Sequence, residues 1–553
     1  MKDKRKIPKY HWAALVFILI HSLISFLFLE AFPYVHSDES WLAGLTRAMM
    51  EEGSIGVTEP FFDLVPRYPH SIKTLFHLLQ MAAVSLFGYR IFSLRLVSLG
   101  AGAAALWFAY LAGGRFLCRS GGFQSPDVLW ESRKKGFLVM AVFSMDIQFL
   151  YASHFARQEI LLSLIQWICL WNLFAPEGFY NEKRGIILGI LTGISIGFHP
   201  NSFVLGVMNG CCFLGAALFP RFLEGKGESG ASKPSWRPLL LYIAVTGGFA
   251  LVFVGMSFMM DPGFPGHYVA YGKREFGIDA PWWERIAGFF GFLKRLYERN
   301  SGTYYLPDIR PQFFLFGLCG SLAAAVSVVM KKEMPEAACH IRILLTGAAG
   351  VICGIICIGR YNQTSILFVF PFGYLAAAMV LELYEGKVQG GMWAVLFASV
   401  LSLTAVQVVP ELKKTDYAHY GRQIRELVPE GAKVLGNLNA EFFMEYDCLR
   451  DYRNLPYALE GEGLSGYLER NRIEYIIYHE ELDYLWEHRP YYNVIYGNVM
   501  FVQELKNYCL NCCEEVGSFQ NSRYGIRVAG ILGQEEYAEV TVYRRASSSS
   551  SRR

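Results

Sequence analysis

The sequence predicts a polytopic α-helical membrane protein that carries a small α/β domain after its last span. Three observations support this fold class. Hydrophobic residues make up 53% of the 553 residues, and charged residues only 18%. Apolar runs of roughly 17–25 residues recur along the chain, and each can cross a hydrocarbon core of about 30 Å. Beyond about residue 410 these runs stop and the composition becomes polar.

The first span follows a basic N-terminal segment, Lys2 to Lys9. Its apolar run is too long for the core of a signal peptide, and no small-residue cleavage site follows it, so we expect it to stay uncleaved. About eleven spans are predicted by length and hydropathy. They lie near residues 11–32, 94–117, 136–153, 159–176, 185–199, 201–219, 238–260, 311–330, 340–358, 362–384 and 390–408.

The apolar stretch Thr74–Phe87 is about fourteen residues long, which at roughly 1.5 Å per residue is too short to cross the membrane. We therefore predict that it lies in the outer interface. With this stretch excluded, the short basic loops all fall on the cytoplasmic side, as the positive-inside bias requires. The loop 261–310 is the exception, because it lies outside and yet carries several lysines and arginines.

The polar C-terminal part predicts an α/β domain over 411–545, which lies outside the membrane by span parity, and a disordered serine-rich tail over 546–553. A helix is expected at Tyr420–Val428. Strands are expected at Lys433–Gly436, Tyr475–Tyr478 and Val540–Tyr543. Cys509, Cys512 and Cys513 lack the second ligand pair of a zinc site, so a disulfide or free thiols are expected there.

This topology places acids and bases from several distant loops at one depth on the outer side of the membrane. The pair Asp38-Glu39 begins the first outer loop, ahead of an amphipathic stretch that suits an interfacial helix. The other members of this set are Arg67, His70, Asp146, Arg157, Glu159, His199 and Arg360. Such convergence is typical of an active site at a membrane surface.

Each member also has a structural interpretation. Asp38 and Glu39 equally suit the start of a helix, where an N-cap and the helix dipole favour acids. Arg157 and Glu159 can form an ion pair without chemistry. His199 is consistent with a polar turn residue, and Arg360 with an arginine that reaches the headgroups.

The order of these features resembles the GT-C-fold glycosyltransferases that use polyprenol-phosphate sugars, a group that includes protein O-mannosyltransferases and lipid A aminoarabinose transferases. The resemblance covers roughly residues 10–410. It is carried by Asp38-Glu39, Leu45–Gly53, Arg67-Tyr68-Pro69-His70, Leu86-Phe87-Gly88 with Arg95-Leu96, Phe155–Leu162, and Arg360-Tyr361 leading to Pro371. Three positions depart from the usual pattern. Glu159 replaces an aspartate, and His70 and Asp146 each replace a proline.

The resemblance implies an inverting transfer of a sugar from a polyprenyl phosphate to a lipid, envelope glycan or protein hydroxyl, on the outer face of the cytoplasmic membrane. It implies that Asp38 is the catalytic base and Glu39 its catalytic neighbour. Arg67 and Arg360 would bind the donor phosphate, to which a guanidinium is well matched. Arg157, Glu159, His199, Asp146 and His70 would line the sugar or acceptor side. No metal ligand set is expected. The acids leave room for Mg²⁺ or Mn²⁺, but no spacing requires either ion.

Two other classes of function use the same features. A transporter or a flippase for lipid-linked sugars would use the outer polar cluster as a path. A structural or sensor protein would bind a partner through the C-terminal domain. The net charge of +3 predicts no nucleic-acid partner, so the expected partners are the lipid-linked donor, its acceptor and membrane lipids.

Overall fold

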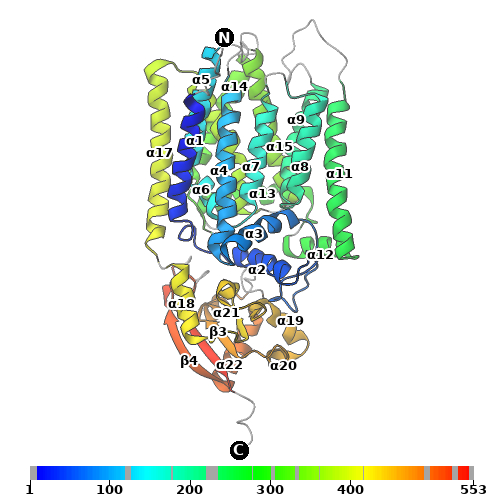
Figure 1. Ribbon diagram of the computed structural model, residues 1–553, viewed down its shortest axis with the longest axis vertical. Coiled ribbons are helices and arrows are strands. Elements are labelled where there is room, and N and C mark those ends of the chain that lie inside the picture. Colours follow the sequence, from blue (N-terminus) through cyan, green and yellow to red (C-terminus); the bar gives the residue numbers. More distant parts are fainter. Residues whose placement is uncertain are drawn as a thin grey trace, which may run out of the picture.

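The computed structural model describes residues 9–118, 126–175, 178–219, 235–276, 278–299, 305–329, 335–359, 361–414, 416–490, 498–525 and 533–546. A bundle of long helices forms one end of the molecule, and a smaller domain with a β-sheet forms the other (Figure 1). The first described helix, α1 (Lys9–Leu27), begins at the end of the bundle that is far from this domain. The chain is therefore a polytopic helical membrane protein with a C-terminal α/β domain, as the sequence predicts.

The helices of the bundle coincide with the predicted spans. They are α1 (Lys9–Leu27), α4 (Ile91–Phe116), α5 (Pro126–Ser144), α6 (Ile147–His154), α7 (Glu159–Leu173), α8 (Glu182–Ile196), α9 (Ser202–Leu218), α11 (Arg237–Met260), α14 (Arg310–Val329), α15 (Pro335–Ile358), η2 (Gln363–Val369) with α16 (Phe370–Leu381), and α17 (Gly386–Leu412).

Length and composition alone qualify seven of the described helices as membrane spans, or eight if the bent pair α5 and α6 is one span. The helices α7 and α9 are apolar but shorter than that test requires. The predicted number of about eleven spans therefore stays a prediction.

The bend between α5 and α6 measures 71°. It occurs at Asp146, which is the N-cap of α6 and accepts hydrogen bonds from the backbone nitrogens of Gln148 and Phe149 at 2.7 and 3.3 Å. A side chain that satisfies the free amides of a new helix start favours a break in the helix at that position. The predicted span 136–153 is therefore two helical segments, and Asp146 lies at their junction.

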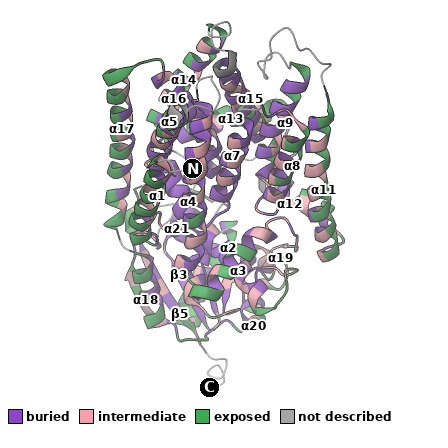
Figure 2. Ribbon diagram, turned by 45° about the horizontal axis from the view of Figure 1, so that its top comes forward, coloured by how far each residue is buried: buried purple, intermediate pink, exposed green. Residues whose placement is uncertain are grey.

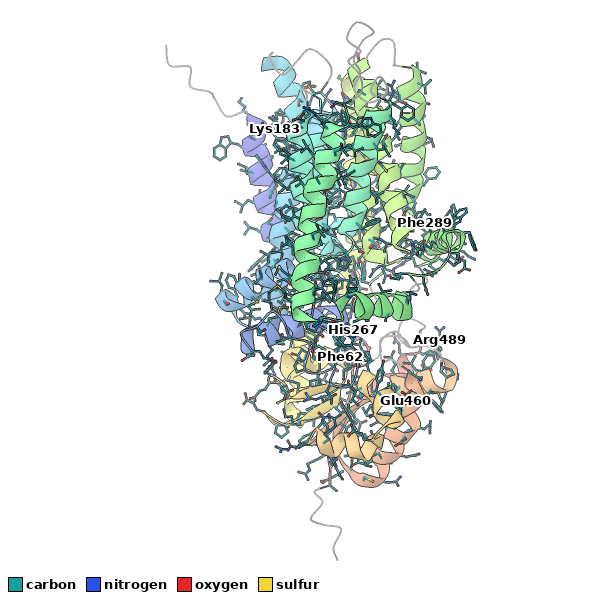
Figure 3. All side chains as sticks on the ribbon, turned by 90° about the vertical axis from the view of Figure 1, so that its right-hand side faces the viewer. Phe62, Lys183, His267, Phe289, Glu460 and Arg489 are labelled. Carbon is teal, nitrogen blue, oxygen red and sulfur yellow. The ribbon has the colours of Figure 1, made fainter. Side chains whose placement is uncertain are left out.

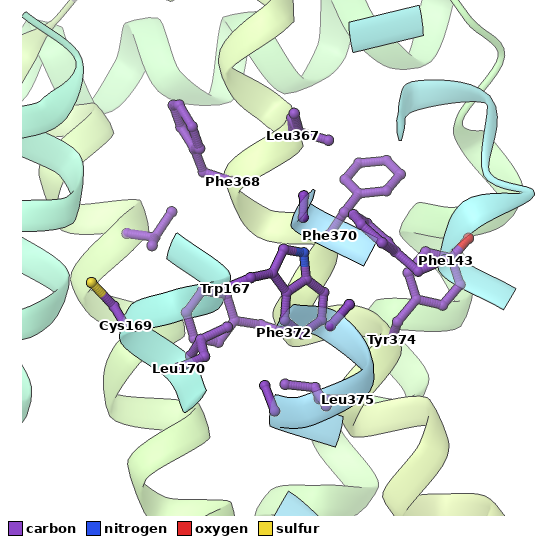
Figure 4. Close-up of a cluster of buried hydrophobic side chains, with 14 of the residues drawn as sticks. Phe143, Trp167, Cys169, Leu170, Leu367, Phe368, Phe370, Phe372, Tyr374 and Leu375 are labelled. Atoms are coloured by element: carbon purple, nitrogen blue, oxygen red, sulfur yellow. The ribbon is translucent and has the colours of Figure 1, made fainter. Parts of the chain in front are cut away.

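The centre of the bundle is packed with large apolar side chains. Trp167 of α7 is fully buried, and its ring lies 5.2 Å from that of Phe143. Figure 4 shows these two residues packed with Phe370, Phe372 and Tyr374 of α16. The peripheral helices α11 and α17 are largely exposed in Figure 2, as expected for helices that face lipid.

Short helices form a layer at the end of the bundle nearest the C-terminal domain. The helices α2 (Ser37–Glu51), α3 (Thr74–Phe87) and α12 (Phe264–Phe276) lie across the bundle axis in Figure 1. This is the arrangement predicted for Thr74–Phe87 and for the amphipathic stretch after Asp38. The helix α13 (Trp282–Glu298) presents exposed Trp282, Trp283 and Phe290, while Phe289 and Phe292 are buried.

The C-terminal domain contains a five-stranded mixed sheet with the strand order β2-β1-β3-β5-β4. The strands β1 (Val434–Gly436), β2 (Leu449–Asp451) and β3 (Tyr475–His479) are parallel, whereas β5 (Glu539–Arg545) pairs antiparallel with both β3 and β4 (Cys513–Gln520). The strands β1, β3 and β5 match the predicted strands. The helices of this domain are α18 (Tyr417–Leu427), α19 (Leu455–Glu460), α20 (Gly463–Arg470), α21 (Glu481–His488) and α22 (Val502–Cys512).

The domain is docked on the first loop of the bundle by backbone and side-chain hydrogen bonds. The backbone nitrogen of Asp451 donates to the carbonyl of Phe61 at 3.1 Å, and the Asn454 amide nitrogen donates to the same carbonyl at 2.7 Å. Phe62 lies at this junction in Figure 3. The loop that follows Asp38 is therefore held between the bundle and the C-terminal domain.

Candidate active site

The first turn of α2 carries the acidic pair. His36 is the N-cap residue, and its Nδ1 accepts a hydrogen bond from the backbone nitrogen of Asp38 at 3.0 Å. The Glu39 carboxylate accepts from the backbone nitrogen of His36 at 3.1 Å, which completes a capping box. Of the two acids, Glu39 therefore serves the helix start, and Asp38 is left to face outward from the same turn.

Glu39 lies inside the protein, where Arg95 of α4 binds it. The two side chains are both 0% exposed, and the guanidinium binds both carboxylate oxygens, at 2.9 and 2.8 Å. The backbone nitrogen of Ala156 donates to the same carboxylate at 2.8 Å. Arg95 also donates to the carbonyls of Leu29 and Pro33 at 2.8 and 2.9 Å. This arrangement differs from the catalytic role predicted for Glu39, because no face of the carboxylate is open to a substrate.

Asp38 is the first member of a chain of charged contacts. Its Oδ2 accepts from Nη1 of Arg157 at 2.7 Å, and Nη2 of Arg157 lies 3.0 Å from Oε1 of Glu159. The Thr364 hydroxyl donates to the same oxygen of Glu159 at 2.8 Å. The Asp38 side chain is 26% exposed, against 5% for Arg157 and 3% for Glu159. Of the two acids in this series of contacts, Asp38 is therefore the one that a substrate can reach.

The inner end of this chain has unsatisfied polar atoms. Oε2 of Glu159 is buried without a hydrogen-bond partner among the residues that the structure describes, and so are both amide atoms of Gln158. Buried polar groups are nearly always hydrogen-bonded in native proteins, so each such atom calls for a ligand or a water. These atoms lie at the start of α7, beside the residues that hold Asp38.

Arg67 packs on Trp41, which lies one turn after Asp38 on α2. Its Nε and Nη2 bind the carboxylate of Glu59 at 3.2 and 3.0 Å, and the Trp41 indole nitrogen donates to Glu59 at 2.5 Å. Burial alone raises the pKa of Glu59. The charge and hydrogen bonds of Arg67, together with the bond from Trp41, outweigh this effect, so the pKa of Glu59 lies below its usual value. Tyr271 of α12 is a further partner, with its ring centre 5.4 Å from the guanidinium carbon of Arg67.

His70 is close to Arg67 and carries no charge near neutral pH. Burial, reinforced by the positive charges of Lys73 and Arg67, lowers the pKa of His70 to about 3. Its ring packs against Tyr268, with the ring centroids 5.5 Å apart. His70 can therefore donate or accept a hydrogen bond, but it does not neutralise an anion.

His199 is linked to this network through Asn201 and Ser365. It lies in the turn between α8 and α9, where its Nδ1 accepts from the backbone nitrogen of Asn201 at 3.0 Å. The Asn201 amide nitrogen donates to the Ser365 hydroxyl at 3.0 Å, and Ser365 follows the Thr364 that binds Glu159. His199 thus supports the turn that contacts η2.

Asp146 is separated from the other predicted site residues by α6. Besides capping that helix, its carboxylate accepts from Tyr374 at 2.6 Å and from Gln312 at 3.0 Å. The eight residues of α6 span about 12 Å at 1.5 Å per residue. The described contacts of Asp146 are thus those of a helix junction, which differs from its predicted place on the substrate side.

The last predicted residue, Arg360, lies outside the described residues. Within the described ranges, no three His, Cys, Asp or Glu side chains are grouped as metal ligands. The acids Asp38 and Glu159 are joined by Arg157, which is itself a cation. The described side chains therefore do not fit a site for Mg²⁺ or Mn²⁺.

Sequence reasoning missed three residues of this site as functional partners, namely Glu59, Trp41 and Arg95. Arg95 had a usable signal, because an arginine within an apolar span requires a buried partner. Glu59 and Trp41 had none, since their pairing depends on how a loop of irregular structure folds back on α2.

No protein-family model matches the sequence, and no curated protein sequence is similar to it at a significant level. Similarity appears instead among solved structures. The crystal structure of ArnT from Cupriavidus metallidurans bound to undecaprenyl phosphate aligns with a TM-score of 0.56 at 12% identity, over 97% of this chain and 98% of that chain. An oligosaccharyltransferase from Archaeoglobus fulgidus, tethered to an acceptor peptide, aligns with a TM-score of 0.49 at 12% identity, over 85% of this chain and 70% of that chain.

The alignment with ArnT spans nearly the full length of both chains, so it includes the bundle and the C-terminal domain together. The chain therefore has the GT-C fold that the sequence predicts. Identity of 12% is low enough that the likeness concerns the fold and not the chemistry.

Proposed function

We propose that this protein is an inverting glycosyltransferase that moves a sugar from a polyprenyl-phosphate donor to an acceptor on the outer face of the cytoplasmic membrane. The observation that carries the proposal is Asp38, a partly exposed carboxylate that Arg157 binds at the end of the bundle nearest the C-terminal domain. The ArnT structure of the same fold contains undecaprenyl phosphate, which supports a lipid phosphate as the donor carrier.

Asp38 acts as the general base. A polyprenyl phosphate is a competent leaving group, so the reaction needs a base for the acceptor hydroxyl more than an acid for the donor. The acceptor oxygen attacks the anomeric carbon while the bond from that carbon to the phosphate oxygen breaks. The hydroxyl proton passes to Asp38, and the bond electrons leave with the phosphate. A single displacement inverts the anomeric centre.

Arg67 binds the donor phosphate. The charge that develops on the phosphate as the bond breaks requires a fixed cation, and preorganised donors of this kind are a major source of rate enhancement. Glu59 holds Nε and Nη2 of Arg67, and the Tyr271 ring centre lies 5.4 Å from the guanidinium carbon, so the guanidinium is fixed in orientation for an anion. We propose Arg360 as a second phosphate ligand on the strength of the sequence resemblance alone.

Arg157, Glu159 and Gln158 recognise the sugar or the acceptor. The unsatisfied oxygen of Glu159 and the unsatisfied amide of Gln158 can together accept from and donate to hydroxyl groups, which are both donors and acceptors. We propose Glu39 as a positioning residue rather than a catalytic one, because it fixes the turn on which Asp38 lies. His70 and His199 contribute hydrogen bonds around this site, and Asp146 supports the helix junction.

The test is transfer of sugar from polyprenyl-phosphate donors by the purified protein in membranes, followed by mass spectrometry of lipid, glycan and protein acceptors. Asp38→Asn keeps the size and the hydrogen bond to Arg157 but removes the base, so the turnover rate falls by about 10²-fold or more. Glu51→Gln, at the exposed end of the same helix, serves as the matched control. Full turnover in Asp38→Asn would remove Asp38 from the mechanism.

A flippase for the lipid-linked sugar is the second candidate, and one observation favours it. Ser163 and Gln166 of α7 each have a buried side-chain oxygen without a partner among the described residues. They lie one and two turns after Glu159, on the same face of that helix. Polar groups inside a span can mark a path. Movement of the lipid-linked sugar across proteoliposomes without covalent turnover would select this function over transfer.

A further inference from the structure

Among the described side chains of the C-terminal domain, Arg453 brings a positive charge to the candidate phosphate site. This residue lies in η4 (Tyr452–Asn454), directly after the strand β2. Its guanidinium carbon lies 5.0 Å from the centre of the Trp41 ring and 4.9 Å from that of Phe62. Trp41 belongs to α2, one turn after Asp38. The contact therefore joins the C-terminal domain to the helix that carries the proposed base.

Trp41 has a second guanidinium on its ring. The guanidinium carbon of Arg67 lies 4.8 Å from the same ring centre. Distances below about 6 Å are those of cation–π contacts, for which tryptophan is the best of the aromatic side chains. One indole thus binds the proposed phosphate ligand from the bundle and an arginine from the C-terminal domain.

The indole also fixes Arg67 indirectly. Its nitrogen donates to Oε1 of Glu59, the oxygen that Nη2 of Arg67 binds at 3.0 Å. A change in the plane of the Trp41 ring would therefore disturb both the stacking and the carboxylate that hold Arg67. Because the carboxylate is buried, its geometry is set by these few partners.

Arg453 is itself held in place from the side of the sheet. Its Nε and its backbone nitrogen both donate to Oδ1 of Asp451, each at 2.9 Å. Asp451 is buried, and its other carboxylate oxygen accepts from the backbone nitrogen of Leu438 at 3.2 Å. The C-terminal domain thus fixes the orientation in which the Arg453 guanidinium meets Trp41.

We infer that the C-terminal domain completes the donor-phosphate site, with Arg453 acting as a positioning residue for Arg67 through Trp41. The charges of the four groups balance, with Glu59 and Asp451 against Arg67 and Arg453. Arg453 therefore adds orientation rather than net attraction for the anion. The inference rests on the proposed function, since it assigns a role to the domain in binding the lipid phosphate.

The experiment measures binding of undecaprenyl phosphate, which carries no sugar, to the full-length protein in nanodiscs. Arg453→Met keeps the length of the side chain but removes the planar cation, and we expect the dissociation constant to rise about tenfold. Trp41→Phe keeps an aromatic ring but removes the donor to Glu59, and a similar rise is expected. Arg453→Lys restores the charge and not the plane, so only part of the affinity returns.

The matched control changes a different contact between the C-terminal domain and the first loop. Tyr467→Phe removes the hydrogen bond of 2.8 Å to Asp63 without touching Trp41, so binding should match that of the natural chain. In the transfer assay, Arg453→Met should raise KM for the donor about tenfold while kcat stays within about threefold. A loss that came only from loosened docking would appear in Tyr467→Phe as well.

Coupling between the two residues gives the decisive readout. If Arg453 acts through Trp41, the double variant binds no more weakly than the weaker single variant, because contacting residues are not additive. Unchanged binding in Arg453→Met, or additive losses in the double variant, would overturn the inference while leaving the proposed function intact. A natural chain that neither binds the lipid phosphate nor transfers sugar would overturn both.

Discussion

At the scale of single residues, adjacent carboxylates on one helical turn have opposite environments. Asp38 is partly exposed and bound to Arg157, whereas Glu39 is sealed against Arg95 and two backbone nitrogens. Two acids next to each other in sequence point about 100° apart around a helix with 3.6 residues per turn. One can therefore face a substrate while the other fixes the turn.

The pair of Glu39 and Arg95 leads to a prediction about stability. Arg95→Met leaves a buried carboxylate without its counter-ion, and breaking such a pair costs about 3–5 kcal/mol. We expect a clear fall in the midpoint of thermal unfolding in detergent. The double variant Glu39→Gln/Arg95→Met buries no charge and should recover part of the loss. If Arg95→Met unfolds at the same temperature as the natural chain, the pair is not the support of the α2 start.

The sequence was sufficient to predict that Asp38 and Arg157 lie at one depth, and the structure joins them by a hydrogen bond. It was not sufficient to show that the Glu39 carboxylate is closed to a substrate, because that closure depends on α4 bringing Arg95 against it. Glu59 was missed for a related reason. Its partners Trp41 and Arg67 meet only after the first loop folds back on α2.

At the scale of the elements, helix periodicity and length were informative in the bundle and less so elsewhere. Each predicted span overlaps one helix or, at 136–153 and 362–384, two helical segments. The break at Asp146 was not predicted, and Asp146 was interpreted as a substrate-binding acid in a continuous span. The acid caps a second helix, and the donors that complete its environment come from α14 and α16. Such long-range partners cannot be read from a local pattern.

The junction between α2 and η3 (Leu438–Phe443) predicts a dependence on pH. Burial raises the pKa of Glu441 to about 7, against the opposing effect of Arg47, whose Nη1 lies 3.5 Å away. Because the folded pKa lies above the unfolded value, the folded chain binds more protons between about pH 4.5 and 7. The contribution to stability is therefore complete below that range and is lost as the pH rises through it.

Thermal unfolding at a series of pH values tests this sign. The natural chain should lose stability from Glu441 by up to about 1.4 kcal/mol per pH unit across that range, and Glu441→Gln should remove this part of the slope. Glu504→Gln, an exposed acid on α22, is the control. Parallel curves for the natural chain and Glu441→Gln would show that the Glu441 carboxyl does not titrate as described.

At the scale of the whole molecule, the candidate site, the layer of short helices and the C-terminal domain share one end of the bundle (Figure 1). The parity of the predicted spans and the basic loops put that end outside the membrane. The fold supports this grouping independently of the loop charges, because α2 contacts both the bundle and the domain.

Labelling with a membrane-impermeant maleimide tests the orientation. Glu460 lies on the C-terminal domain and Lys183 at the opposite end of the bundle, as Figure 3 shows. In intact cells, Glu460→Cys should gain a mass shift over the parent chain, whereas Lys183→Cys should gain one only after the membrane is opened. In the proposed reaction the lipid-linked donor and its acceptor meet on the side that bears Asp38, so the reverse pattern would move that reaction to the cytoplasmic leaflet. It would also make the seven positive charges of the loop 261–310 ordinary members of the positive-inside pattern, and the remaining loops its exceptions.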